Sequence, residues 1–277
     1  GMAAVHAGLM SQLRAGDRVV SARLLFGSCR WIVAELLPRF GIEVVLVDGS
    51  DLDAWARALA EPTRLVFFET PGNPTLELVD IEAVSALAHT AGAKVVVDNV
   101  FATPVLQRPM ALGADMVIYS ATKHIDGQGR CLGGVILTDA ATRKDVLQPY
   151  LKNTGPSLSP FNAWVLSKGL ETLELRLRAH VEGAARVAAF LEGHPAVEAV
   201  LYPGAASHPQ HALATRQMAA DLRAYHLRIR AILKQAKLAF NNKRWDKCER
   251  LCNNVLRMEP NHEKALKMKE EAITYRH

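Results

Sequence analysis

Short runs of apolar, often β-branched residues alternate with longer amphipathic segments in the first part of the chain. The apolar runs predict strands at Arg18–Ala22, Glu43–Val47, Leu65–Phe68, Lys94–Asp98, Met116–Ser120 and Gly134–Thr138. The amphipathic segments predict helices over Cys29–Phe40, Leu52–Ala60 and Ile81–Ala91. Apolar strands that alternate with helices are typical of an α/β fold, with a mostly parallel sheet covered by helices on both faces.

The stretch after the last of these runs is mainly helical. Pro160 to about Glu192 has no internal proline and is expected to be a long helical segment. Val197–Leu201 is expected to form a further strand, which ends in a turn at Tyr202-Pro203-Gly204.

The composition changes abruptly near Met218–Leu222. Residues 219–277 contain 14 Lys and Arg against 7 Asp and Glu, whereas residues 1–218 contain 19 against 21, so the net charge of +5 comes from the tail. All 18 glycines precede position 219. We therefore expect two domains, 1–218 and 219–277. The tail's basic residues are interleaved with Glu, which favours a solvated face over a nucleic-acid surface.

The overall composition is that of an ordinary globular protein. Hydrophobic residues make up 49% and charged residues 22% of the 277 positions, which excludes a disordered or collagen-like chain. The apolar runs are too short for a membrane span, and the N-terminus lacks a signal-peptide pattern. Four scattered cysteines favour a reducing compartment over a disulfide framework, so we expect a cytoplasmic location and no membrane partner.

The most specific chemical pattern is Ser120-Ala121-Thr122-Lys123-His124, followed by the glycine-rich segment 127–134. A lysine after a buried strand, beside hydroxyl groups, suits a Schiff base with pyridoxal phosphate, for which its amine should be partly desolvated. Asp98, at the end of the preceding strand, can pair with the protonated pyridine nitrogen. Taken singly, such a lysine is usually a surface residue, and such an aspartate is often a turn former or helix cap.

Together with other segments, this pattern resembles the Cys/Met-metabolism family of pyridoxal-phosphate-dependent enzymes. The resemblance covers residues 1 to about 218 and rests on the following segments: Gly1-Met2-Ala3-Ala4, Leu25-Phe26-Gly27-Ser28, Glu69-Thr70-Pro71-Gly72-Asn73-Pro74-Thr75, Val97-Asp98-Asn99, Ser120–His124 and Leu201-Tyr202-Pro203-Gly204. Phe26-Gly27-Ser28 and Leu37-Pro38-Arg39-Phe40-Gly41 resemble the O-succinylhomoserine sulfhydrylase branch. The resemblance implies the large domain of a fold-type I transferase.

The resemblance also implies a role for each matched residue. Lys123 would carry the Schiff base and transfer protons as the catalytic residue. Asp98 would hold the pyridinium, Asn73 would donate to the phenolic oxygen of the ring, and Phe26 would stack on its face. In many members a tyrosine occupies the place of Phe26, and simple core packing is the other interpretation of this phenylalanine.

The phosphate of the cofactor would be held by a second group of matched residues. Gly1 and Met2 would offer backbone N–H groups at a helix N-terminus, a favourable place for an anion. Ser120 and Thr122 would add hydroxyl groups.

Two departures from the family pattern are expected to impair activity. The sequence starts inside the phosphate-binding motif, without the family's N-terminal arm, and the resemblance stops before the small domain, which carries the arginine for the substrate carboxylate. Arg176 and Arg178 lie on the long helical segment, where we interpret them as a solvated or packing face. Apolar surface left uncovered would favour a homo-oligomer.

The tail is expected to be helical, with helices near Asp221–Phe240, Trp245–Met258 and His262–Tyr275 and turns at Asn241-Asn242-Lys243 and at residues 259–262. Its small and apolar positions resemble one tetratricopeptide repeat, which would suit a protein or peptide partner. Cys248 and Cys252 are four residues apart, and the helical pattern favours buried hydrophobic positions over metal ligands, so no metal is expected.

Three functions remain open. The resemblance favours γ-replacement on O-succinylhomoserine by sulfide, a step of methionine biosynthesis with an amino acid substrate. A γ- or β-lyase reaction of the same family is the second. The third is a catalytically incompetent fold remnant that binds a protein through its helical tail.

Overall fold

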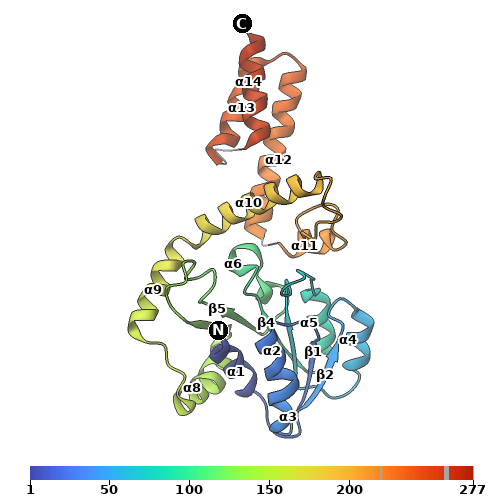
Figure 1. The fold of residues 1–277 in the computed structure, drawn as a ribbon, viewed down its shortest axis with the longest axis vertical. Coiled ribbons are helices and arrows are strands. Elements are labelled where there is room, and N and C mark those ends of the chain that lie inside the picture. The colour runs from blue at the N-terminus through green and yellow to red at the C-terminus, as the bar shows by residue number, and fades with distance from the viewer. Residues whose placement is uncertain (219, 259–261, 277) are drawn as a thin grey trace. The chain divides into compact units, whose positions relative to one another are not determined.

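The computed structural model describes residues 1–218, 220–258 and 262–276. The chain forms two compact units, Gly1–Met218 and Ala219–His277. The first is an α/β unit and the second is helical (Figure 1). None of the helices in the described ranges is long and apolar enough to cross a membrane.

One six-stranded sheet forms the centre of the first unit. Its strands are β1 (Arg18–Ala22), β2 (Glu43–Val47), β3 (Leu65–Glu69), β4 (Lys94–Asp98), β5 (Met116–Ser120) and β6 (Gly134–Thr138). They are ordered β2-β1-β3-β4-β5-β6. All neighbours are parallel except β5 and β6, which are antiparallel. The mostly parallel sheet is confirmed, as are the six strands predicted between Arg18 and Thr138, with β3 one residue longer.

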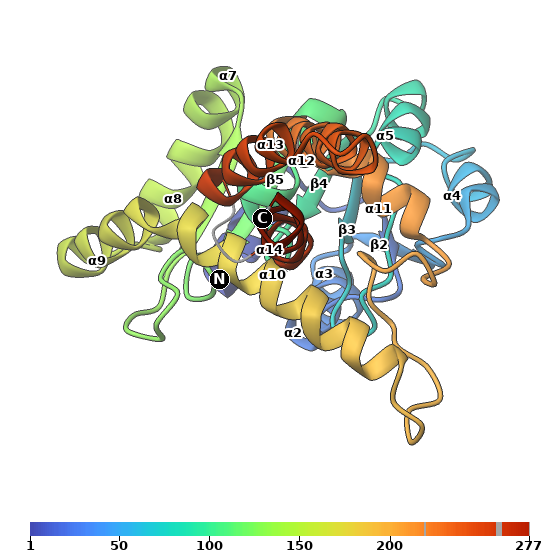
Figure 2. The same cartoon turned by 90° about the horizontal axis from the view of Figure 1, so that it is seen from above.

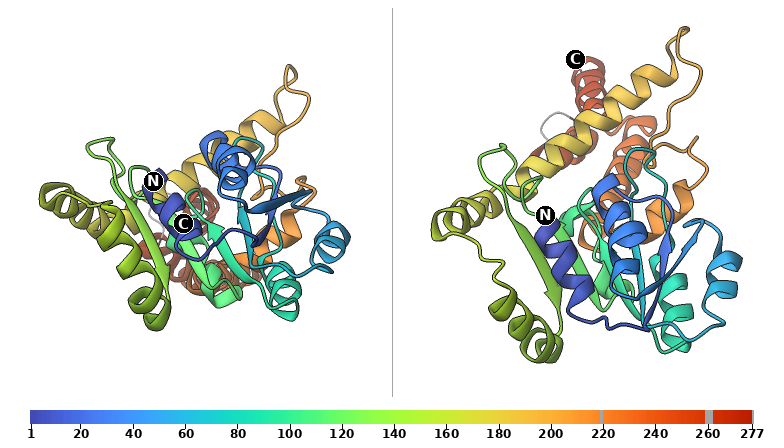
Figure 3. Two further views of the ribbon diagram at one scale, coloured as in Figure 1. Left: turned by 90° about the horizontal axis from the view of Figure 1, so that it is seen from below. Right: turned by 60° about the horizontal axis from the view of Figure 1, so that its bottom comes forward.

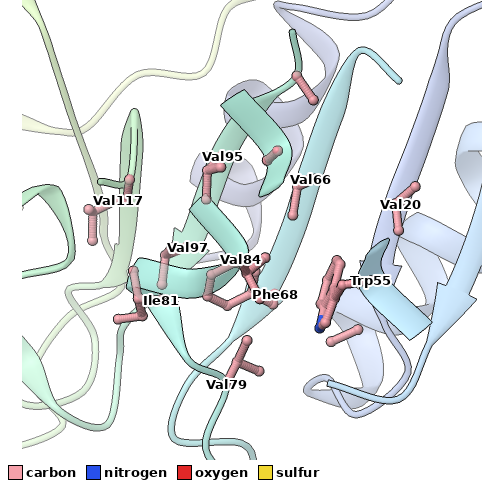
Figure 4. Close-up of a cluster of buried hydrophobic side chains, with 14 of the residues drawn as sticks. Val20, Trp55, Val66, Phe68, Val79, Ile81, Val84, Val95, Val97 and Val117 are labelled. Atoms are coloured by element: carbon pink, nitrogen blue, oxygen red, sulfur yellow. The ribbon is translucent and has the colours of Figure 1, made fainter. Parts of the chain in front are cut away.

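Apolar clusters cover both faces of this sheet. On one face, Trp55 of α4 (Leu52–Ala58) and Ile81 of α5 (Ile81–Thr90) pack on strand residues such as Val66 and Phe68 (Figure 4). On the other face, α1 (Met2–Met10) and α2 (Gly27–Trp31) supply Leu9 and Cys29 to a second cluster. Strands buried on both faces need no polar alternation, which explains their continuous apolar runs.

Some helices of this unit begin at capping residues that accept hydrogen bonds from free backbone N–H groups. Asp51 accepts from the Ala54 N–H at the start of α4, and Asp80 accepts from the Ala83 N–H at the start of α5. After α2, the chain continues through a π-helical turn, Ile32–Leu36, into α3 (Leu37–Arg39). The predicted helix over Cys29–Phe40 is thus confirmed.

Shorter helices complete the unit. They are α6 (Thr103–Leu106), a 3₁₀ turn at Pro109–Leu112, α7 (Ala140–Thr142), a π-helical turn at Arg143–Leu147, α8 (Gln148–Thr154), α9 (Pro160–Glu171), α10 (Leu173–Glu192) and α11 (His211–Gln217). Figure 2 shows α7, α8 and α9 on the β5 side of the sheet and α4 on the β2 side. The expected long helical segment is present and is interrupted at Thr172, between α9 and α10.

The predicted strand at Val197–Leu201 is wrong. These residues form no regular element, and Leu201 is 63% exposed. A β-branched run becomes a strand only where another strand offers hydrogen-bonding groups, and none of the strands in the described residues pairs with this run. The turn after it is present, with the Ala205 N–H donating to the Tyr202 carbonyl.

The second unit contains α12 (Ala220–Asn241), α13 (Trp245–Met258) and α14 (Glu263–Arg276). Small and apolar side chains from all three helices form its core, with Cys248 and Cys252 fully buried as predicted. The predicted turn at Asn241-Asn242-Lys243 is present, whereas most of the predicted turn at 259–262 lies outside the described residues.

Candidate functional site

The carboxyl ends of the central strands meet at one edge of the sheet. Because β3, β4 and β5 are parallel neighbours, their last residues, Glu69, Asp98 and Ser120, lie at this edge, with Glu69 opposite Asp98 in the strand register. The antiparallel β6 starts at the same edge, with Gly134 opposite Ser120. Ligands of open α/β sheets bind at such edges.

The start of α1 packs closely against the end of β5. A Cβ built on Gly1 would be only 2.7 Å from Ser120 Oγ, so the two backbones approach this closely because residue 1 is glycine. The Gly1 nitrogen also donates to the Gly133 carbonyl at 2.5 Å. Figure 3 shows α1 beside the green strands with its N-terminal end at this edge. The structure thus brings together the serine and the helix start that were predicted to hold a phosphate.

Thr122 and Met2 complete this part of the site. The Thr122 hydroxyl accepts a hydrogen bond from the Gly133 N–H at 3.1 Å and lies 3.4 Å from the Gly133 carbonyl. It therefore ties the turn after β5 to the loop before β6. Met2 is the first residue of α1, where helix N–H groups lack intrahelical acceptors.

Asp98 is a buried carboxyl group at the end of β4, only 5% exposed. Its Oδ1 accepts from the Val100 N–H at 3.1 Å, and the Cys29 thiol lies 3.9 Å from Oδ2. Burial raises the pKa of Asp98 to about 6, against the lowering effects of the Val100 N–H and the nearby Gly1 amino group. A buried carboxylate that accepts so few hydrogen bonds would be stabilised by a cationic partner.

Glu69 links Phe26 and Asn73 to this edge. Its Oε2 accepts from the Phe26 N–H at 2.6 Å, and the backbone N–H of Asn73 lies near enough to the carboxylate to lower its pKa. Phe26 is the N-cap of α2 and is 43% exposed, and Asn73 is half-buried in the loop after β3. Burial, followed by the Asp98 carboxylate, raises the pKa of Glu69 to about 7.

Lys123 lies in the turn that follows β5, and its side chain is exposed. The partial desolvation of its amine, expected from the sequence, remains a prediction. The Lys123 N–H donates to the Ser120 carbonyl, which holds the turn to the end of the strand.

Arg176 of α10 holds the same turn from outside. Its guanidinium donates to the carbonyls of His124 at 2.8 Å and Ile125 at 3.2 Å, and to Gly169 at 2.9 Å. The interpretation of Arg176 as a solvated face is thus wrong, whereas its alternative as a packing residue is confirmed. Arg178 instead pairs with Glu174 at 2.7 Å on the helix surface.

Sequence reasoning assigned no role to Glu69 or Arg176. Glu69 closes an otherwise apolar run, Leu65–Phe68, and a charge at the buried end of a strand is a usable signal. Arg176 gave no such signal, because its partners are backbone carbonyls and any residue could supply them.

The residues at this edge fit pyridoxal phosphate. A buried carboxyl group suits a pyridinium nitrogen, and the start of α1 beside Ser120 offers N–H and hydroxyl groups to an anion. A lysine in the adjacent turn suits the aldehyde. The mostly parallel sheet and this set of groups define the large domain of the fold-type I pyridoxal-phosphate-dependent class.

Comparison with known proteins narrows this class to one family. A family model described as Cys/Met metabolism PLP-dependent enzyme matches residues 1–274. The chain belongs to this family, whose cofactor is pyridoxal 5'-phosphate.

Individual relatives cover the first unit. O-succinylhomoserine sulfhydrylase of Mycobacterium tuberculosis is 59% identical over 218 residues, which are 79% of this chain and 54% of the relative. L-methionine gamma-lyase of Fusobacterium nucleatum subsp. polymorphum is 43% identical over 220 residues, which are 79% of this chain and 56% of the relative. A crystal structure of cystathionine gamma synthase from Xanthomonas oryzae pv. oryzae in complex with cystathionine superposes with a TM-score of 0.76 at 38% identity, over 79% and 56% of the two chains. The chain thus spans about half the length of these relatives.

Proposed function

We propose that residues 1–218 bind pyridoxal 5'-phosphate at the carboxyl edge of the sheet. Lys123 would bind the aldehyde carbon, and Asp98 would pair with the ring nitrogen. Gly1, Met2, Ser120 and Thr122 would hold the phosphate. The juxtaposition of Gly1 with Ser120, beside a buried Asp98, carries this proposal.

The ring would be held by the two residues that Glu69 links. Asn73 would donate to the phenolic oxygen and Phe26 would stack on one face, where a phenyl group excludes water but supplies no proton.

When bound, the cofactor supplies an electron sink for a carbanion on the substrate. Lys123 Nζ would take a proton from a substrate carbon and return it to another. Asp98, as a carboxylate, would keep a proton on the ring nitrogen. Its burial strengthens this interaction because solvent screening is weak there.

For the reaction, we propose γ-replacement: O-succinylhomoserine and sulfide give homocysteine and succinate. The 59% identity to a sulfhydrylase, against 43% to a methionine γ-lyase, supports this assignment. A γ- or β-lyase reaction is the alternative within the family.

Cofactor titration of the purified chain tests the proposed binding of pyridoxal phosphate. We expect a visible absorbance band on addition of pyridoxal phosphate, and attachment to Lys123 after borohydride reduction. Lys123→Ala should abolish both, whereas the matched control Lys152→Ala, at an exposed lysine of α8, should not. Absence of binding at high micromolar cofactor would contradict the proposal.

Product analysis tests the proposed γ-replacement reaction. Homocysteine and succinate in equal amounts from O-succinylhomoserine and sulfide support γ-replacement, and α-ketobutyrate with ammonia supports γ-elimination. A chain that binds the cofactor but converts neither substrate supports the catalytically incompetent alternative.

The helical unit is a candidate protein-binding module. This assignment is favoured by the separate hydrophobic core that α12, α13 and α14 form among themselves. Leu238 and Leu266 remain 55% and 38% exposed beside this core. A photo-crosslinker placed at Leu266 in the full chain should capture one defined partner in stoichiometric amount. No capture, or capture unchanged by Leu238→Glu, would contradict this role.

Homo-oligomerisation is a further proposal for the chain. Phe161, Trp164 and Phe190 on α9 and α10 are each more than half exposed, an unusual density of large apolar side chains. Light scattering should show more than one copy, and a monodisperse monomer would contradict this.

A further inference from the structure

The Glu69 carboxylate lies between two segments that carry proposed cofactor contacts. It is 5% exposed and follows four apolar residues at the end of β3. Among the described residues Glu69 forms no ion pair; its Oε2 accepts from the Phe26 N–H, and the Asn73 N–H lies near the carboxylate. A carboxylate is costly to bury unless hydrogen bonds hold it, so the position of Glu69 calls for an explanation.

The two donors belong to different parts of the chain. The Phe26 N–H comes from the start of α2, 43 residues before Glu69, and the Asn73 N–H comes from the loop after β3. Each of these backbone groups belongs to a residue whose side chain is assigned to the cofactor ring. In the strand register, Glu69 stands opposite Asp98, the third residue assigned to the ring.

We propose that Glu69 is a positioning residue of the cofactor site, which fixes Phe26 and Asn73 relative to Asp98 through its bond to the Phe26 N–H and its contact with the Asn73 N–H. This inference rests on the proposed cofactor site. Glu69 touches no reacting atom. It acts by holding the aromatic and amide side chains in place before the ring enters, which lowers the ordering cost of binding.

Glu69→Gln provides a nearly isosteric test. A carboxylate is an acceptor at both oxygens, whereas the amide replaces one acceptor with an NH₂ donor, which then faces a backbone N–H donor. One of the two anchoring contacts is therefore lost without a change in volume. The substitution also removes a buried negative charge beside Asp98, so the apoprotein should not lose stability at pH 7.5.

Three measurements on the full chain test the positioning role of Glu69. Hydrogen exchange of the cofactor-free protein should be at least tenfold faster at the Phe26 or Asn73 amide in Glu69→Gln. The Kd for pyridoxal phosphate should rise about tenfold, while the urea midpoint at pH 7.5 stays equal or increases. Glu82→Gln, at an exposed position of α5, is the matched control and should change none of these.

Other outcomes would overturn the inference. Unchanged exchange at both amides, or an unchanged Kd, removes the positioning role. A fall in stability that parallels the loss of affinity assigns Glu69 a purely structural role. If the wild-type chain fails to bind the cofactor, the proposed function fails, whereas the exchange measurement still reports whether Glu69 anchors the two segments.

Discussion

The guanidinium of Arg176 lies directly on the backbone of Gly127, so that a Cβ built on Gly127 would overlap its Nη1. Gly127 has a φ of 74° and its N–H donates to the Lys123 carbonyl at 2.7 Å. This close approach allows Arg176 to reach the carbonyls of His124 and Ile125. The turn that presents Lys123 is thus held by a helix that begins 50 residues later.

Gly127→Ala should destabilise the first unit more than Gly129→Ala does. Both glycines have positive φ, but nothing lies within 4 Å of a Cβ on Gly129. The two variants therefore share a backbone cost of about 1 kcal/mol, and Gly127→Ala adds the displacement of Arg176, about 1–3 kcal/mol. Urea unfolding measures the difference. Equal losses in the two variants would contradict the close contact.

Arg176→Lys should loosen the Lys123 turn. A lysine has one ammonium group and cannot reproduce the planar set of donors that reaches three carbonyls. We expect faster hydrogen exchange over residues 121–128 and a loss of about 1–3 kcal/mol in stability. Arg178→Lys, two residues away at a surface ion pair, is the control and should change stability by less than about 1 kcal/mol. Exchange that is equal in both variants would argue against the role of Arg176.

The stability of the cofactor-free protein should fall as pH rises from about 4.5 to 7. Burial and Asp98 raise the pKa of Glu69 from 4.5 to about 7 in the folded state, so between these values the folded chain holds a proton that the unfolded chain has lost. The contribution from Glu69 is complete below pH 4.5 and is lost as pH rises through 7, by up to about 3 kcal/mol. Asp98, with a pKa raised to about 6, acts in the same direction at lower pH.

Glu69→Gln should flatten this dependence, most clearly between pH 6 and 7, where the Asp98 contribution is nearly lost. Urea midpoints at several pH values provide the measurement. The exposed-site variant Glu82→Gln should keep the wild-type slope, and a slope that survives in Glu69→Gln would assign the effect to another group.

Cysteine reactivity should separate Cys131 from the other three thiols. Cys29, Cys248 and Cys252 are buried, whereas Cys131 is half-buried. Burial raises the pKa of Cys29, Cys248 and Cys252, the last to about 12, which leaves little thiolate for reaction. A thiol reagent at pH 8 should therefore modify Cys131 first, as mass spectrometry would show. Cys131→Ser should abolish the fast phase, and fast labelling of Cys248 would contradict the packing of the helical unit.

The strands and most helices could be predicted because their signals are local. The run Val95-Val96-Val97 is apolar on both sides, and only a strand covered on both faces accommodates it. Asp51 and Asp80 mark helix starts by a bond that closes within one turn. Val197–Leu201 carries the same local signal without a pairing partner, so its prediction failed.

The sequence by itself determined the strand order along the chain, the change of composition at residue 218, and the motif residues Lys123, Asp98 and Asn73. Only the tertiary structure decided that Lys123 is exposed, that Gly1 packs on Ser120, and that Glu69 and Arg176 hold the segments around them. The physical reason is that the last two side chains bind main-chain N–H and carbonyl groups. Every non-proline residue carries both groups, so no side-chain pattern marks the partners, and only folding brings them within reach.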